Sequence, residues 1–159
     1  MNAETLKHLP WNILGANGET STIHQTTHKG KIIIKKQLNP EYKQEYLNEL
    51  SCLQALQASK HFPTLYAHDD DHLILYMSYC GKRLYPRTKP RNWEEQINNI
   101  IQIIYDKDII YSDIKIDHLR VHNDNTIRLI DFGRATVGPQ KRKQDIHKFY
   151  DLAKNVIYE

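Results

Sequence analysis

The segment Gly30–Leu38, GKIIIKKQL, constrains the fold most strongly. Three consecutive isoleucines are β-branched and favour a strand that is buried on both faces. Lys35 and a second lysine follow them directly. A charge flanked by buried neighbours needs a partner, because an unpaired buried ion is costly. We therefore expect a sheet with a helix packed on it, and we expect Lys35 to pair with Glu49 of that helix.

The first half of the chain predicts a β-rich unit. Gly15 and Gly18 precede β-branched residues, which indicates a hairpin whose turn carries the glycines and whose second strand includes Ile23. Asn39-Pro40 is typical of a helix start, and the helix after it has one apolar stripe. The stripe consists of Tyr46, Leu50 and Leu53, with Leu47 and Leu56 beside it.

The rest of the chain predicts two more strands, a connector and mainly helix. Apolar stretches around Leu65 and at 73–79 are separated by an acidic turn, DDD. After the polar connector, Asn92 and Glu95 suggest a capping box at the start of a long helix. Residues 119–130 read as a hairpin, and a last helix is expected from Asp145.

Composition excludes several classes of protein. The chain has 159 residues, 40% hydrophobic, and a net charge of +3. This size and composition fit one folded domain or one small two-lobed unit, and the charge is far below that of a nucleic-acid binder. Cys52 and Cys80 have no metal-ligand spacing, and HDDDH at 68–72 reads as a solvated turn rather than a metal site. Because the first residues contain no apolar h-region and no apolar run approaches the length needed to span a bilayer, we expect no secretory signal and no membrane span. We expect a cytoplasmic protein, with delivery into a host cell as an effector, or a viral origin, as alternatives.

Two aspartates suggest chemistry. Asp113 follows IIYS and precedes Ile-Lys115, whereas Asp131 follows IRLI and precedes Phe-Gly. Each motif alone is weak. In combination, however, a glycine turn, a strand lysine, a helix glutamate, Asp-x-Lys and Asp-Phe-Gly occur in the order that phosphoryl transfer from ATP requires.

With these motifs the chain resembles the protein kinase-like superfamily over nearly its whole length. Residues 97–135 resemble the stretch from the long C-lobe helix through the catalytic loop to Asp-Phe-Gly; ELSCLQAL resembles the αC helix, and LYMSYCGKRL the hinge. The resemblance implies an α+β bilobal fold, with an antiparallel β N-lobe, one αC helix and a truncated, mainly helical C-lobe. It implies one domain, 1–159, with an N-lobe at about 1–80, a hinge at about 78–91 and a C-lobe at about 92–159.

The resemblance also implies roles for individual residues. Lys35 would contact the α- and β-phosphates of ATP and pair with Glu49. Asp113 would orient the acceptor hydroxyl, with Lys115 near the transferred phosphoryl group, and Asp131 would bind Mg²⁺. The residues expected to contact the nucleotide are Gly15, Gly18, Ile23, Lys35, Met77, Ser78, Tyr79 and Cys80.

The chain departs from the family pattern at the catalytic loop. Tyr111 and Ser112 replace the His-Arg of the family, so no switch by activation-loop phosphorylation is expected. His118 stands where the family has an asparagine for the second Mg²⁺. An imidazole suits Mn²⁺ better than Mg²⁺, so His118 is a candidate metal ligand. A phosphate-contacting cation and a packing role are its alternatives.

These features predict a minimal, atypical ATP-dependent kinase that phosphorylates Ser or Thr on a protein, similar in economy to small kinase-like bacterial effectors. Two other hypotheses stay open: a small-molecule or glycan kinase, and an ATP-binding interaction module, or pseudokinase, that acts through a partner. The last predicted helix would expose apolar surface, which suggests a partner or dimer contact there.

Overall fold

The computed structural model describes residues 1–17, 20–112, 115–138, 151 and 154. Its strands are β1 (Asn12–Asn17), β2 (Ser21–His28), β3 (Lys31–Leu38), β4 (Leu65–Asp69), β5 (Ile74–Ser78), β6 (Lys82–Arg83), β7 (Ile109–Ile110), β8 (Leu119–Val121), β9 (Ile127–Leu129) and β10 (Thr136–Val137). Its helices are α1 (Ala3–Lys7), α2 (Lys43–Ala55) and α3 (Trp93–Asp106), with 3₁₀ turns η1 (Pro40–Tyr42) and η2 (Ile116–His118).

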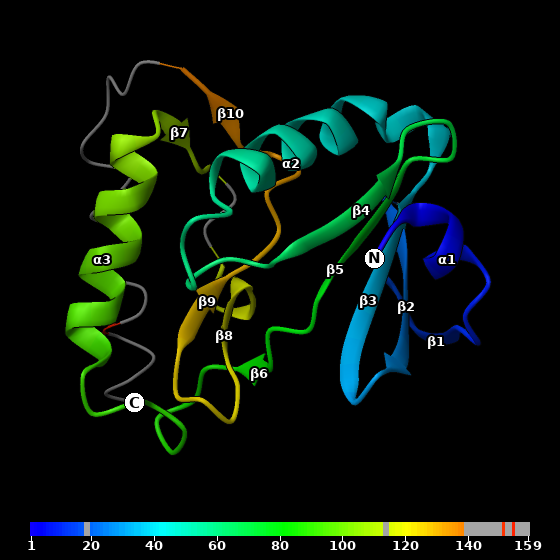
Figure 1. Ribbon diagram of the computed structural model, residues 1–159. Coiled ribbons are helices and arrows are strands. Elements are labelled where there is room, and N and C mark those ends of the chain that lie inside the picture. The colour runs from blue at the N-terminus through cyan, green and yellow to red at the C-terminus, as the bar shows by residue number, and fades with distance from the viewer. Residues whose placement is uncertain (18–19, 113–114, 139–150, 152–153, 155–159) are drawn as a thin grey trace.

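The largest sheet is antiparallel, in the order β1-β2-β3-β5-β4. Helix α2 crosses one face of it, and the short α1 lies against the other, as Figure 1 shows. Ile33 on β3 is fully buried beneath α1, with Leu6, Ile74 and Tyr76. The isoleucine-rich strand is therefore central in the sheet, with a helix on each face. The predicted burial holds only in part, because Ile33 is buried, Ile34 is half-buried and Ile32 is 37% exposed.

The second half of the described chain is built around α3. Ile97, Ile100 and Ile104 form its buried face and pack in the same core cluster as α2 and the inner face of the large sheet. Two small sheets complete this half: β6-β8-β9, and β7 paired with β10. The α+β architecture expected from the sequence is confirmed.

Local details differ from the sequence prediction at two helix starts. Asn39-Pro40 opens η1, and α2 begins only at Lys43. At α3, Asn92 occupies the N-cap but makes no capping hydrogen bond to the backbone; its Oδ1 accepts a bond from Gln96 Nε2 instead, at 2.9 Å. The helix predicted from Asp145 lies outside the described residues. Within the described part, no helix has the length and apolar character that crossing a bilayer demands.

Candidate active site

Lys36, not Lys35, is the strand lysine that pairs with Glu49. Its Nζ donates to Glu49 Oε2 at 2.7 Å and lies 3.4 Å from Asp131 Oδ1. Side chains alternate between the two faces of a strand, so a shift of one residue moves a side chain to the opposite face. Lys36 is opposite Ile23 on β2 and Leu75 on β5, which places it on the face toward α2.

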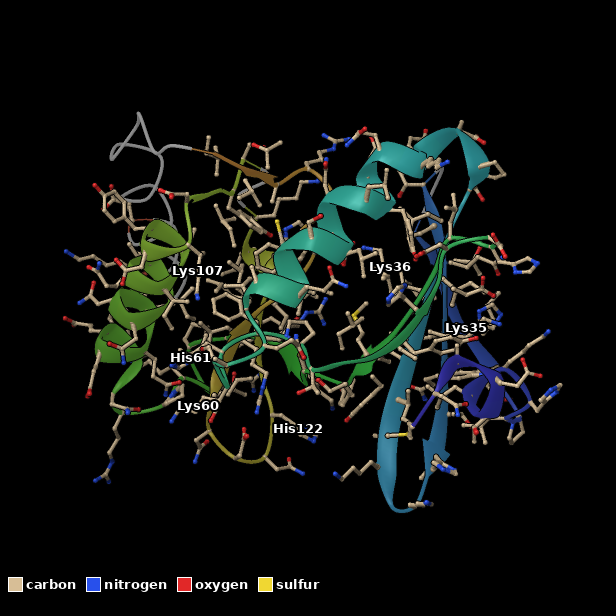
Figure 2. The ribbon with its side chains drawn as sticks, turned by 45° about the horizontal axis from the view of Figure 1, so that its top comes forward. Lys35, Lys36, Lys60, His61, Lys107 and His122 are labelled. Carbon is tan, nitrogen blue, oxygen red and sulfur yellow. The ribbon has the colours of Figure 1, made fainter. Side chains whose placement is uncertain are left out.

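Lys35 lies on the outer face of the sheet. It is opposite Tyr76, and its Nζ sits 5.8 Å from the ring centroid of Trp11. Figure 2 shows Lys35 on the side of α1 and Lys36 on the side of α2. The predicted pairing of Lys35 with Glu49 is therefore wrong, because the strand register directs that side chain away from α2.

The three charges form one cluster, in which Lys36 and Glu49 are buried and Asp131 is half-buried. Glu49 is only 2% exposed and Lys36 only 8%. Burial opposes the charged form of Lys36, yet Glu49 and Asp131 outweigh it and hold its pKa above the usual value. Burial raises the pKa of Glu49, and the ammonium of Lys36 counters this only in part. For Asp131, burial is outweighed by the hydrogen bond from His118 and by Lys36, so its pKa lies well below the usual value.

Asp131 has a backbone conformation that non-glycine residues seldom adopt. Its φ is +67°, in the left-handed region, which costs energy and is found at functional sites that the surrounding structure over-determines. The neighbouring Phe132 is fully buried and packs edge-on against Phe62 and Tyr111. Asn48 on α2 donates to the carbonyl of Gly133 at 3.2 Å. Packing on both sides thus holds the Asp131 carboxylate toward Lys36.

His118 is buried beside Asp131 and fixed by Tyr111. Its Nε2 lies 3.3 Å from Asp131 Oδ2, and its Nδ1 lies 2.8 Å from Tyr111 Oη. The hydroxyl of Tyr111 donates its single proton to the carbonyl of Ile130 at 2.7 Å, so Nδ1 of His118 must be the donor to Tyr111. This leaves Nε2 facing the carboxylate, where it donates to Asp131 when it bears a proton and could ligate a metal when it does not.

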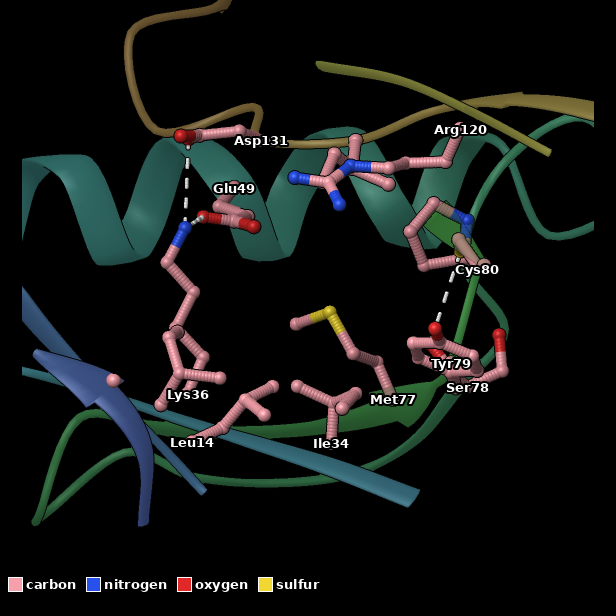
Figure 3. A pocket seen from close by; sticks show the side chains of 15 residues that line it. Leu14, Ile34, Lys36, Glu49, Met77, Ser78, Tyr79, Cys80, Arg120 and Asp131 are labelled. Atoms are coloured by element: carbon pink, nitrogen blue, oxygen red, sulfur yellow. Dashed lines mark hydrogen bonds and ion pairs between the residues drawn. The ribbon is translucent and has the colours of Figure 1, made fainter. Parts of the chain in front are cut away.

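A cavity of about 280 Å³ opens beside the charge cluster. Figure 3 shows Lys36, Glu49 and Asp131 at one end and the strand-to-connector segment Ser78–Cys80 at the other. The predicted nucleotide contacts Gly15, Ile23, Met77, Ser78, Tyr79 and Cys80 all line it. Most of its exposed surface is apolar, which suits a flat heteroaromatic ring. The predicted residues Gly18 and Asp113 lie outside the described part of the chain.

A second, more polar cavity of about 440 Å³ shares Lys36, Arg120 and Asp131 with the first. Lys115 and His118 line it. Among the described residues, no cluster of three or more His, Cys, Asp or Glu side chains is arranged to hold a metal by itself. A divalent ion held beside Asp131 and His118 would therefore need further ligands, such as phosphate oxygens or water.

Comparison with known families decides the classification. Residues 13–153 match the protein kinase domain. The chain belongs to the protein kinase family. Over 104 residues it is 27% identical to an Aurora kinase of Eremothecium gossypii, an alignment that covers 56% of this chain and 28% of the relative. The aligned region therefore makes up less than a third of the length of that curated relative.

Sequence reasoning missed seven of the residues that line the cavity. They are Leu14, Ile34, Lys36, Pro63, Gly81, Arg120 and Ile130. Strict alternation along β3 could have found two members of the site, because Ile34 and Lys36 are two apart and so share a face. No pattern in the sequence predicts that Arg120 points inward.

Proposed function

We propose that this protein is an ATP-dependent phosphotransferase that acts on an alcohol acceptor, namely Ser or Thr on a protein, as one kinase-like unit over residues 1–159. The main support for this proposal is that Lys36, Glu49 and Asp131 meet at one end of a cavity whose other end is apolar. Membership of the protein kinase family supports the same chemistry.

Each residue has a role that its position supports. The base of ATP would lie between Ile34 and the 78–80 segment, beneath Leu14 and Ile23. Lys36 would bind the phosphates, and Glu49 would hold its ammonium in place. Lys115 would face the transferred phosphoryl group from the polar cavity. Asp113, by its place in the Asp-x-Lys motif, would accept the proton of the attacking hydroxyl.

The side chains present fit a divalent metal ion. Asp131 offers carboxylate oxygen, and the Nδ1–H to Tyr111 hydrogen bond leaves His118 Nε2 as a ligand. Metal-bound histidines commonly donate their other N–H to an oxygen in this way. Bound Mg²⁺ or Mn²⁺ would neutralise phosphate charge. The nitrogen of His118 favours Mn²⁺ more than an amide oxygen would.

The test is transfer of labelled γ-phosphate from ATP with Mg²⁺ or Mn²⁺, using a mixture of protein acceptors and, separately, a panel of metabolites and sugars. The proposal predicts label on protein, and loss of that label in D113A and K36M but not in K35M. Turnover on metabolites alone would replace the protein acceptor by a small molecule. Absence of transfer to any acceptor, with no ATP hydrolysis that D113A removes, would refute an enzymatic role and favour the interaction module.

A further inference from the structure

Arg120 places a cation in the wall of the cavity, where none of the motifs requires one. It projects from β8, directly before Val121, and lines both the apolar cavity and the polar one. Figure 3 shows its side chain reaching into the cavity toward the end that holds Glu49 and Asp131. The guanidinium therefore lies where the two cavities meet, between the base end and the Lys36 end.

The guanidinium is anchored at one nitrogen. Its Nε donates to the backbone carbonyl of Asp117 at 2.8 Å. Within the described part of the chain, this is the hydrogen bond that Arg120 makes, and no carboxylate is paired with it. The two Nη groups, which form the outer part of the fork, are therefore available to an acceptor in the cavity.

Arg120 adds positive charge to a cavity whose other charged groups sum to a negative charge. Lys36 is already shared between Glu49 and Asp131, so those three groups together carry a net negative charge. A polyphosphate entering here would meet carboxylates as well as an ammonium. Arg120 offsets that repulsion, and its planar fork matches the oxygens of a phosphate group better than any other side chain does.

We propose that Arg120 binds a phosphate group of the nucleotide and sets the preference of this site for nucleotides over nucleosides. This rests on the proposed function, because it presumes that a nucleotide occupies the cavity. A nucleotide whose base lies against the 78–80 segment and whose terminal phosphates reach Lys36 must pass the junction with its first phosphates. Arg120 is thus a specificity-determining residue, distinct from Lys36.

Arg128 is a matched control. It lies directly opposite Arg120 on the adjacent strand β9, but its guanidinium is occupied by Asp124 at 2.8 and 3.1 Å and does not line either cavity. Substituting it by methionine removes the same charge from the same small sheet. A general effect of net charge or of sheet stability would therefore appear in R128M as well as in R120M.

The experiment is calorimetric titration of the full chain with ATP, ADP, AMP and adenosine in Mg²⁺, for wild type, R120M, R120K and R128M. We expect R120M to bind ATP and AMP about tenfold or more weakly and adenosine within about twofold of wild type. R120K, which keeps the charge but lacks the fork, should lose less, and R128M should match wild type. R120K also serves if R120M does not fold.

The alternatives give different results. An equal loss for adenosine and ATP would mean that the guanidinium stacks on the base, and it would overturn the proposal. Unchanged ATP binding in R120M, or an equal loss in R128M, would also overturn it. Failure of the wild type to bind any of the four ligands would instead refute the proposed function on which this inference rests.

Discussion

Replacing Lys36 by methionine should destabilise the protein far more than the same change at Lys35. K36M leaves Glu49, which is 2% exposed, without its cation, and removes the lysine partner of Asp131. Breaking a buried ion pair by removing one member costs about 3–5 kcal/mol. K35M loses a cation–π contact with Trp11, worth about 0.5–1 kcal/mol at an accessible site.

Urea unfolding followed by circular dichroism measures both costs under identical conditions. The two variants are matched controls, since the lysines are neighbours on one strand. Domains of this kind are stable by only about 5–15 kcal/mol, so K36M should lose a large fraction of its stability. Equal costs for the two variants, or a larger cost for K35M, would refute the register assigned to β3.

The cost of K36M should also depend on pH. Burial raises the pKa of Glu49, and Lys36 lowers it, so removing the lysine raises that pKa further. A carboxyl group whose folded pKa lies above its unfolded value favours the folded state while protonated, and that benefit disappears as pH rises through the folded pKa. We therefore expect K36M to be least destabilised near pH 5 and most destabilised at pH 8. A penalty that is independent of pH would contradict an uncompensated Glu49.

Three smaller effects follow from single contacts. Y111F should cost about 1–3 kcal/mol in urea unfolding, because it leaves the His118 Nδ1–H and the Ile130 carbonyl without their buried partner; a cost no larger than that of Y85F would contradict the assigned network. Burial raises the pKa of Cys80 to about 11, so its thiol should react slowly with a disulfide reagent at pH 8 until urea is added, and a fast native reaction would contradict this. Arg128 lowers the pKa of Asp124 to about 2 in the folded protein. The ion pair therefore stabilises the fold at pH values above the pKa of Asp124 in the unfolded chain, and this stabilisation is lost as pH falls toward 2. D124N should abolish this acid dependence at a cost below about 1 kcal/mol at pH 7, since the carboxylate is half exposed.

The sequence predicts β1 to β5, the β8–β9 hairpin and α2 well because their patterns are local, but it does not predict α1 or the short strands β6, β7 and β10. The predicted hairpin and the isoleucine run correspond to β1–β3, and the acidic turn separates β4 from β5. The prediction that Gly15 lies in the hairpin turn is wrong, because Gly15 lies within β1, opposite Ile23, at an irregularity in the strand register. Gly18 lies outside the described residues. The same local reasoning failed by one residue at the lysine, since two adjacent lysines give no composition signal for which face each takes. The burial of Ile33 beneath α1 determines that Lys35 faces α1 and Lys36 faces α2. This contact joins segments that are distant in the sequence, so the local pattern does not reveal it.

The site could be predicted as a set of motifs but not as a geometry. The order of the motifs indicated phosphoryl transfer. Apart from Lys35, all six described residues that were predicted to contact the nucleotide line the cavity. The left-handed conformation of Asp131 and the Tyr111–His118 hydrogen bond depend on tertiary packing, which no short pattern encodes. The orientation of the Arg120 side chain toward the cavity also depends on tertiary contacts, including the hydrogen bond from its Nε to the carbonyl of Asp117.

The central claim is that Lys36 and Asp131 bind a metal–nucleotide complex in this cavity. Thermal unfolding with and without ATP, in Mg²⁺ and in Mn²⁺, tests it most directly for wild type, K35M, K36M and D131A. Ligand that binds only the folded state raises the melting temperature. We predict that ATP stabilises wild type and K35M alike and leaves K36M and D131A unshifted. No ATP-dependent shift in wild type, or loss of the shift in K35M with retention in K36M, would contradict the account.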